Sequence, residues 1–299
     1  MKKLITYIGF LIALSFTACV KDSMEQPELD ITINKTTFSV GDTAKFKISG
    51  TPFNLVFYSG DVGNDYYSRN TYTATGGLSS MTFTTALTAT AGNSPATNLK
   101  ILVSNNFSGE YSKNKILEAT WTDVTSQVTV PGTATVDLNP FKVDGKPVYV
   151  AFRFLTEDET KVQRQVTVSA FSLRTVFPSQ TYINASNVYF GGFASFDFAG
   201  ETTSLWSIPI TSNANNSFSH PLVAANSAKD DDWAISKAFN LNTVMPSTGV
   251  ALKNITSNPV LNHSYVFTKA GTYKMVFVAS NNNMNDYKEV VKEFAVTVQ

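Results

Sequence analysis

The sequence predicts an all-β protein, and three observations support this class. Thr, Ser, Val and Asn are abundant, and aromatic residues make up 12% of the chain, a composition that favours strands joined by polar turns. Many short runs have apolar residues at every second position, as strands with one buried face do. No long stretch of the mature region has the i, i+3, i+4, i+7 spacing of an amphipathic helix.

Length and charge set further limits. The 299 residues are enough for two ordinary domains. Basic and acidic residues both total 23, so the formal net charge is zero, and no basic stripe follows any predicted strand. Because nucleic-acid binding depends on such a stripe, we expect no nucleic-acid partner.

The N-terminal segment, residues 1–18, has the layout of a secretion signal. Lys2 and Lys3 precede an apolar run that ends at Phe16 and is too short to span a bilayer comfortably. Small residues then lead to Cys19, the only cysteine of the chain. This stretch resembles a bacterial lipobox, although Phe16 stands where that family usually has Leu. The resemblance implies that Cys19 carries lipid; an ordinary signal peptide or an uncleaved membrane helix are the alternatives.

Lipidation would have two consequences. Two or more acyl chains anchor a protein firmly, at roughly 0.8 kcal/mol per buried CH₂, and Cys19 would leave no thiol for disulfides, catalysis or metal binding. Residues 19–28 are predicted to be a flexible polar tether. Their Lys21-Asp22 step resembles the surface-export signal of Bacteroidetes lipoproteins, which implies an outer-membrane protein that faces the cell surface.

Residues 29–72 and 248–299 each contain short alternating runs separated by Gly- or Asn-containing turns. Three strands in the first segment are too few to close a sandwich, so they need partners. The predicted strands of the two segments are Leu29–Ile33, Thr43–Ile48, Asn54–Tyr58, Tyr265–Phe267, Thr272–Val278 and Glu289–Val298.

The two segments resemble the two halves of an immunoglobulin-like PKD domain. Ser59–Gly63 is similar to the Gly-Asp loop of that family, and the C-terminal hairpin is similar to its closing strands. The usual Trp before the loop is absent, with Phe57 and Tyr58 nearby. We therefore predict one discontinuous immunoglobulin-like (PKD-like) β-sandwich, with residues 73–247 inserted as a second domain.

The predicted insertion resembles the jelly-roll β-sandwich modules of Bacteroidetes surface proteins. The matching stretches are Leu99–Ser104, Ala119–Val124, Val136–Leu138 and Lys146–Arg153. With its split PKD-like halves, the mature chain resembles an uncharacterised family of surface lipoproteins often found beside outer-membrane glycan-uptake machinery. The resemblance implies glycan-uptake proteins as partners, although a fold does not fix a function.

Catalytic signatures are mostly missing, and we do not expect an enzyme. The sequence contains no His-Glu-x-x-His, Gly-x-Ser-x-Gly or Gly-rich phosphate loop. His220 and His263 stand in Ser, Asn and Pro contexts that favour surface turns. Carboxylates on distant strands could form a glycosidase pair, but solvated loop charges explain them better. These candidates are Asp65, Glu157, Asp197 and Glu201.

No cofactor is expected, with a structural calcium ion as the open alternative. Glu157-Asp158-Glu159 and Asp230-Asp231-Asp232 are acidic clusters of the kind that bind calcium through hard oxygen ligands. Neither has the alternating Asp-x-Asp-x-Asn-Gly spacing, so solvated charged turns are the favoured interpretation.

Aromatic residues are the candidate ligand contacts, since sugar rings stack on aromatic faces. Trp206 is ambiguous, Tyr66 and Tyr67 follow the Gly-Asp loop, and Trp121 and Trp233 fit core positions. The leading hypothesis is a lipoprotein that binds an extracellular glycan through Trp206, Tyr66 and Tyr67 without transforming it. The alternative is a protein-binding adhesin or envelope assembly component, which would present a flat apolar patch or an exposed strand edge. An enzyme would instead need a pocket of converging carboxylates.

The lipid anchor generates the first prediction. Replacing Cys19 with Ser removes the acylated thiol and should release the protein from the membrane fraction after cell lysis. If the variant still requires detergent for extraction, another segment anchors the chain.

Overall fold

The computed structural model describes residues 23–88, 98–199, 204–211 and 217–299, so the predicted secretion signal and Cys19 lie outside the described residues. The chain divides into two compact units. The first combines the segment up to Thr71 with Pro246–Gln299, and the second is Tyr72–Met245. Both consist mainly of strands, which confirms the predicted all-β class with one discontinuous sandwich.

Two sheets form the first unit. The smaller has the order β1-β3-β16, with β1 (Asp30–Ile33), β3 (Thr43–Ser49) and β16 (Asn262–Val266). The larger has the order β15-β4-β17-β18-β2, with β15 (Val250–Lys253), β4 (Asn54–Tyr58), β17 (Gly271–Asn282), β18 (Tyr287–Val298) and β2 (Thr37–Phe38).

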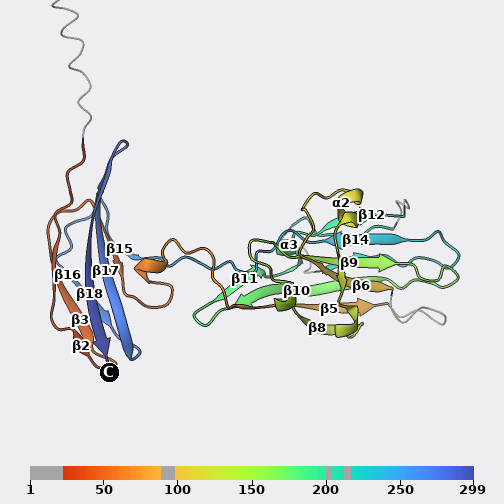
Figure 1. Ribbon diagram of the computed structural model, residues 1–299, viewed down its shortest axis with the longest axis horizontal. Helices are drawn as coiled ribbons and strands as arrows, with labels where there is room; N and C mark the ends of the chain where they lie inside the picture. The colour runs from red at the N-terminus through yellow and green to blue at the C-terminus, as the bar shows by residue number, and fades with distance from the viewer. Residues whose placement is uncertain (1–22, 89–97, 200–203, 212–216) are drawn as a thin grey trace, which may run out of the picture. The chain divides into compact units, whose positions relative to one another are not determined.

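Both sheets of the first unit contain strands from opposite ends of the sequence. In the larger sheet β4 pairs antiparallel with β17, so that Val56 faces Val278. In the smaller, β3 pairs with β16. Figure 1 shows this mixture as blue strands among red and orange ones. Each sheet therefore needs both chain segments to form.

The core of the first unit lies between its sheets. Alternate residues of β3 and β4 point inward, and Phe46 and Phe57 are each 1% exposed. After β4 the chain turns at Gly60, which has φ +83°; a Cβ there would lie 2.9 Å from the carbonyl oxygen of Lys274. Glycine is therefore required where this loop crosses β17.

The second unit is a sandwich of two five-stranded sheets. One has the order β11-β10-β5-β8, with β13 also paired to β10: β5 (Leu78–Leu87), β8 (Gly132–Asp137), β10 (Val166–Val176), β11 (Thr181–Ala185) and β13 (Ser217–His220). The other has the order β12-β14-β9-β6-β7: β6 (Leu99–Ser104), β7 (Thr122–Asp123), β9 (Tyr149–Leu155), β12 (Ala194–Asp197) and β14 (Asp231–Ile235).

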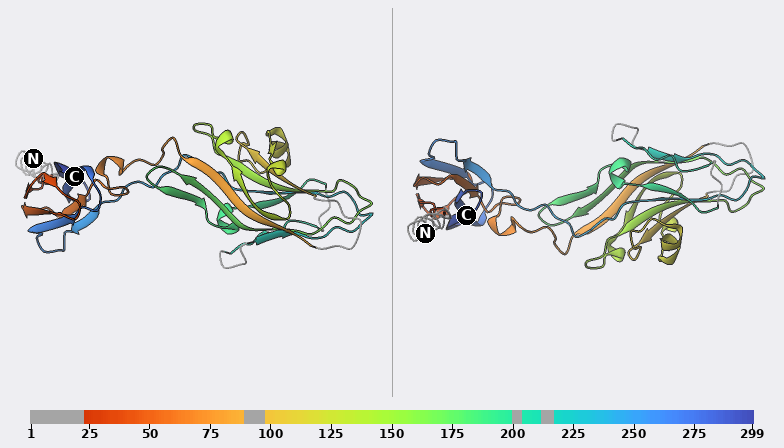
Figure 2. Two further views of the ribbon diagram at one scale, coloured as in Figure 1. Left: turned by 90° about the horizontal axis from the view of Figure 1, so that it is seen from below. Right: turned by 90° about the horizontal axis from the view of Figure 1, so that it is seen from above.

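The helical segments within the described ranges are short. They are η1 (Tyr66–Ser68), α2 (Lys113–Glu118), η2 (Thr125–Gln127), η3 (Asn139–Phe141) and α3 (Val188–Gly191). The long β5, orange, runs beside β10 in both views of Figure 2.

Strands β9 and β14 are covered on both faces. Phe152 and Ala234 belong to the main core between the two sheets. Ala151 and Trp233, on the opposite face, pack in a second cluster with Ile116 of α2. Because both faces are buried, β14 carries side chains into two separate interiors.

His263 was expected in a surface turn, and this prediction was wrong. It shares a face of β16 with Tyr265, is half-buried, and its ring lies 4.5 Å from that of Phe57. Among the described residues its Nε2 has no hydrogen-bond partner, and burial lowers the pKa of His263. The strand period of two explains this position, because residue 263 has the same parity as the inward-facing aromatic residues that follow it.

The pairing of distant segments predicts that the second unit can be removed. The Ser247 amide donates to the Ser68 carbonyl at 3.2 Å, so the two chain ends of the first unit already lie together. Replacing residues 72–245 with a short Gly linker should leave a folded remnant with a cooperative thermal transition. A remnant without dispersed amide resonances would show that the first unit needs the second to fold.

The burial of His263 predicts acid sensitivity of the first unit. Its folded pKa is below the unfolded value of about 6.5, so the unfolded chain binds more protons as pH falls through and below that value. Stability should therefore be fully present above about pH 6.5 and decrease on acidification, and His263→Phe should flatten this dependence. All three tryptophans, Trp121, Trp206 and Trp233, belong to the second unit. Tryptophan fluorescence therefore follows unfolding of the second unit, whereas circular dichroism follows both units, so a transition seen only by circular dichroism reports the first unit. If the stability of the first unit depends on pH equally in the unmodified chain and in His263→Phe, the assignment is wrong.

Candidate functional site

Tyr66 and Tyr67 lie on a capped turn of the first unit. Asp65 caps η1: its Oδ1 accepts from the Tyr67 amide at 3.2 Å and its Oδ2 from the Ser68 hydroxyl at 2.6 Å. Asp65 therefore has a local structural role that fixes both tyrosines.

This turn packs on the outer face of the larger sheet of the first unit. The ring of Tyr66 makes edge contacts with those of Tyr58, at 5.5 Å, and Tyr67, at 5.4 Å. The Tyr67 hydroxyl donates to the carboxylate of Glu293 on β18. Val276, which pairs with both Tyr58 and Glu293, is 0% exposed although it points away from the core. The tyrosines thus cover part of the sheet.

Beside this covered part runs an apolar row. Val56, Val278 and Val291 are register partners across β4, β17 and β18, and all three are partly exposed. Tyr287 stands at the start of β18 and is 56% exposed. We call Tyr58, Tyr66, Tyr67, Tyr287 and these three valines the tyrosine face.

The aromatic rings of the tyrosine face differ in how much surface they present. The Arg69 guanidinium lies 3.7 Å from the centre of the Tyr66 ring and so occupies one of its faces. Tyr67 is 54% exposed, with the Lys274 ammonium 4.9 Å from its ring centre. Tyr67 and Tyr287 therefore offer most of the open ring surface.

Trp206 does not belong to an exposed platform, and its prediction as a surface contact was wrong. It lies in the core of the second unit, 3% exposed, and its Nε1 donates to the Asp232 carbonyl at 3.0 Å. Ser207 forms an antiparallel bridge with Ser219 of β13, which turns Trp206 to the same face as His220. This pairing, which joins residues 12 apart, has no signature in the local sequence.

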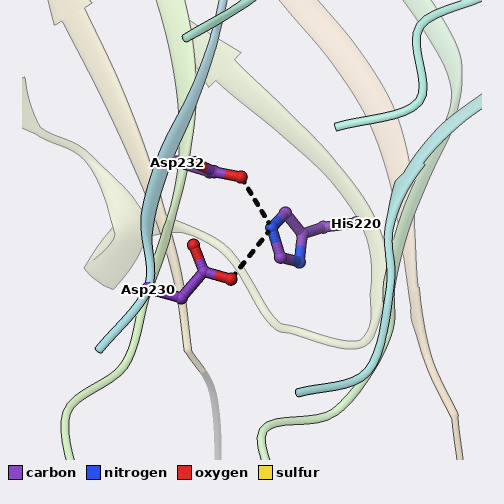
Figure 3. A group of neighbouring side chains, drawn as sticks. All are labelled: His220, Asp230 and Asp232. Atoms are coloured by element: carbon purple, nitrogen blue, oxygen red, sulfur yellow. Dashed lines mark hydrogen bonds and ion pairs between the residues drawn. The ribbon is translucent and has the colours of Figure 1, made fainter. Parts of the chain in front are cut away.

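A polar cluster lies in the same core. It consists of His220 at the end of β13, Asp230 directly before β14 and Asp232 within β14, which approach one another in Figure 3. His220 and Asp232 are 0% exposed and Asp230 is 2% exposed. The His220 Nε2 lies 3.0 Å from Asp232 Oδ2 and 3.6 Å from Asp230 Oδ2. We call these three residues the buried polar cluster.

The imidazole of His220 has a defined orientation. Phe154 stacks on it with ring centres 3.6 Å apart. Its Nδ1 lies 2.9 Å from the carbonyl oxygen of Pro221, and because a carbonyl can only accept, Nδ1 is the donor. The Nε2 is then the atom left to face the two carboxylates.

The carboxylates of the cluster are poorly compensated. Burial, and then the charge of Asp232, raise the pKa of Asp230 to about 7. Burial also raises the pKa of Asp232, although its hydrogen bond with His220 opposes the shift. The Oδ1 atoms of both aspartates have no hydrogen-bond partner among the described residues. Most buried polar atoms are hydrogen-bonded, so these two oxygens require an explanation.

Asp231, between them, has another role. It points to the opposite face of β14, where its carboxylate forms a two-point ion pair with Arg153 at 2.6 and 2.7 Å. Strand alternation therefore separates the three consecutive aspartates, and they do not converge as a calcium loop would require.

Of the remaining acidic candidates, Asp197 lies beside the cluster, whereas the others lie apart from it or outside the described residues. Glu157 is exposed and pairs with Lys100 at 3.3 Å, while Asp158 pairs with Lys161 at 3.4 Å, as expected of a solvated turn. Asp197 of β12 is half-buried and is the register partner of Asp232. Glu201 lies outside the described residues.

Sequence reasoning placed His220 on the surface, whereas it is completely buried. One signal could have found it: Phe218 and His220 are two residues apart, so a strand that buries one buries the other. Asp230 and Asp232 have the same spacing. That the two pairs meet depends on how the sheets face each other.

Fold and geometry define a β-sandwich protein with an inserted domain, an exposed tyrosine face and a buried polar cluster. A family described as a domain of unknown function (DUF5017) matches residues 18–193, more than half of the chain, and the protein belongs to this family. The matched region includes Tyr66 and Tyr67 and ends before the buried polar cluster. No curated protein matches the chain.

The position of Trp206 predicts a structural role. Trp206→Ala would leave a cavity beside Phe218 and should destabilise the second unit by about 3–5 kcal/mol. Fluorescence of Trp121 and Trp233 during denaturation would measure this loss. A change below about 1 kcal/mol would mean that the indole is not packed in the core.

Proposed function

We propose that the protein is a lipid-anchored surface lipoprotein that binds an extracellular glycan at the tyrosine face without transforming it. The observation that carries this proposal is the exposure of Tyr67 and Tyr287, at 54% and 56%, on the same sheet face as a partly exposed valine row. Flat aromatic rings beside polar side chains suit the apolar C–H faces and the hydroxyl groups of sugars.

Energetics favour several contacts of this kind acting together. One aromatic contact contributes about 1 kcal/mol beyond its buried area, and millimolar affinity requires about 4 kcal/mol. The tyrosine face offers two open rings and the valine row, and the Asn54 amide and the Glu289 carboxylate lie near its edge. We therefore expect affinities between the high-micromolar and millimolar ranges for each site, raised when many tethered copies engage one polymer.

Binding without catalysis is supported by the position of the ionisable groups. The one cluster of converging carboxylate and imidazole groups among the described residues is buried, so a polymeric substrate has no access to it. On the tyrosine face, the Glu293 carboxylate accepts a hydrogen bond from Tyr67 and is thereby held in a structural contact.

An exposed strand edge is one of the two kinds of surface expected for a protein partner. Among the described residues, β18 pairs on its outer side only with β2, at Thr297 and Val298. However, Lys288 and Lys292 are half-buried on the inward-facing side of this edge, a placement that discourages strand addition. This argues against a protein partner that binds by strand addition at this edge.

Location and partners follow from the N-terminal motif and the family resemblance. We propose anchoring through lipid on Cys19 in the outer membrane, facing the cell surface, next to proteins of glycan uptake. In the part of the chain that the structure describes, no helix is long and apolar enough to cross a membrane. The proposal makes Cys19 the attachment point. The predicted flexible tether is wrong for residues 24–26, which hydrogen-bond to Asp286, Asn281 and Glu289 of the first unit and are therefore held against it.

The tyrosine face predicts the effect of two substitutions on glycan binding. Tyr67→Ala and Tyr287→Ala should each weaken binding about fivefold, because each removes about 1 kcal/mol of stacking, and the double variant should bind below detection. Binding would be measured by titrating the full chain, purified in mild detergent, with a panel of host and plant glycans.

Tyr189→Ala is the matched control, since Tyr189 is 40% exposed but belongs to the second unit. Equal loss in this variant would assign binding elsewhere. A uniformly negative panel with the unmodified chain would favour a protein ligand instead.

A further inference from the structure

We infer that His220, Asp230 and Asp232 bind one divalent metal ion of the zinc class in the core of the second unit. One imidazole nitrogen and two carboxylate oxygens, each from a different residue, lie within 4.8 Å of one another. The sequence favoured a solvated turn at the consecutive aspartates, with calcium as the open alternative; the structure instead brings together two of them and a histidine from another strand.

The orientation of His220 is that of a metal ligand. Metal-binding histidines usually donate the N–H of the other ring nitrogen to a carbonyl or carboxylate, which fixes the tautomer. His220 does so through Nδ1 to the Pro221 carbonyl at 2.9 Å, and Phe154 holds the ring from one side. Because Nδ1 is the donor to that carbonyl, Nε2 is the ring atom left to bind an ion, and it faces two carboxylates, which attract a cation.

Spacing of the ligand atoms fits a small tetrahedral ion. Nitrogen and oxygen ligands bind zinc at about 2.0–2.2 Å, which puts tetrahedral neighbours about 3.3–3.5 Å apart. The two distances from His220 Nε2 are 3.0 Å and 3.6 Å, on either side of this value. Small side-chain movements would make room for an ion between these atoms.

Unpartnered oxygens are the second, independent observation. The Oδ1 atoms of Asp230 and Asp232 are buried without a hydrogen bond among the described residues. Two carboxylates beside one imidazole carry an excess negative charge, which is costly in an apolar interior. A divalent cation would neutralise this charge and could use these oxygens directly.

The donor set distinguishes between metals. Calcium requires six to eight oxygen ligands, whereas an imidazole with two carboxylates suits zinc and related transition metals, which need four ligands in all. Asp230 and Thr156 also line a surface depression of about 670 Å³, which gives an ion a short path to the site. Water from this side can supply a fourth ligand.

The ion would connect the two sheets of the sandwich. β13, which carries His220, pairs with β10 in one sheet, whereas β14, which carries Asp232, pairs with β9 in the other. Metal binding to the folded chain alone would raise its stability by mass action. The site would thus act as a cross-link in a unit, Tyr72–Met245, that contains no cysteine for a disulfide.

The test is metal binding to the full chain, purified in mild detergent and stripped with a chelator. Equilibrium dialysis against zinc, with elemental analysis, should give one ion per chain and a higher melting temperature of the tryptophan signal. Cobalt(II) should give the intense visible absorption of a tetrahedral site. The ions would be supplied at concentrations that saturate a site with a nanomolar to micromolar Kd. Binding of less than about 0.2 equivalents of both ions would then overturn the proposal, and the cluster would hold protons only.

Variants locate the ion. His220→Gln and Asp230→Asn should lose the bound metal and the zinc-dependent rise in melting temperature. Asp231→Asn and His263→Gln, which alter the neighbouring aspartate and the other histidine, should keep both. If the first pair folds and retains the metal, or if the control pair loses it, the ion lies elsewhere and the assignment is wrong.

Discussion

The antiparallel pairing of β4 with β17 is the constraint on which the architecture depends. It joins Val56 to Val278 in register and places the aromatic residues of both strands in one core. The first segment cannot bury its apolar faces without the last. Bringing such distant segments together has a large loop-closure cost, which the intervening chain reduces by folding into a unit of its own with adjacent ends. The insertion therefore makes the discontinuous sandwich feasible.

The core of the second unit combines apolar side chains with buried ionisable ones. Its interior is lined by Phe152, Phe154, Phe218 and Trp206, yet it also contains two aspartates and a histidine. Polar groups are retained in such a core only when their interactions offset the loss of hydration. Trp206 contributes to this arrangement, because its indole donates to the backbone of Asp232 and packs edge-on against the His220 ring. Trp206, which was predicted to contact a ligand on the surface, instead packs in the core.

Strand alternation accounts for the difference between the two candidate sites. On β18, Tyr287, Val291 and Glu293 have the parity that points away from the core. On β14, which is buried on both faces, the same alternation sends Asp232 into one interior and Asp231 towards Arg153 on the other. The outer face of β18 has no covering layer and remains open to ligands. Because β14 is covered on both faces, its side chains contact only other buried or half-buried groups.

The sequence by itself determined the all-β class, because strand periodicity is local and strong in runs such as Thr43–Ser49 and Val166–Val176. It also indicated that residues 29–72 need the C-terminal strands, since three strands are too few to close a sandwich. The position of Tyr66 and Tyr67 directly after the Gly-Asp loop is likewise encoded in the chain order, and their role as ligand contacts stays a prediction. The spacing of His220 from Phe218 could have indicated that His220 is buried, but only the tertiary structure decided that Trp206 is buried and that His220 meets Asp230 and Asp232. Those positions depend on which strands pair and on how two sheets face each other across a core. Such long-range packing leaves no periodic trace in the neighbouring residues, and for that reason the buried polar cluster emerged from the fold alone.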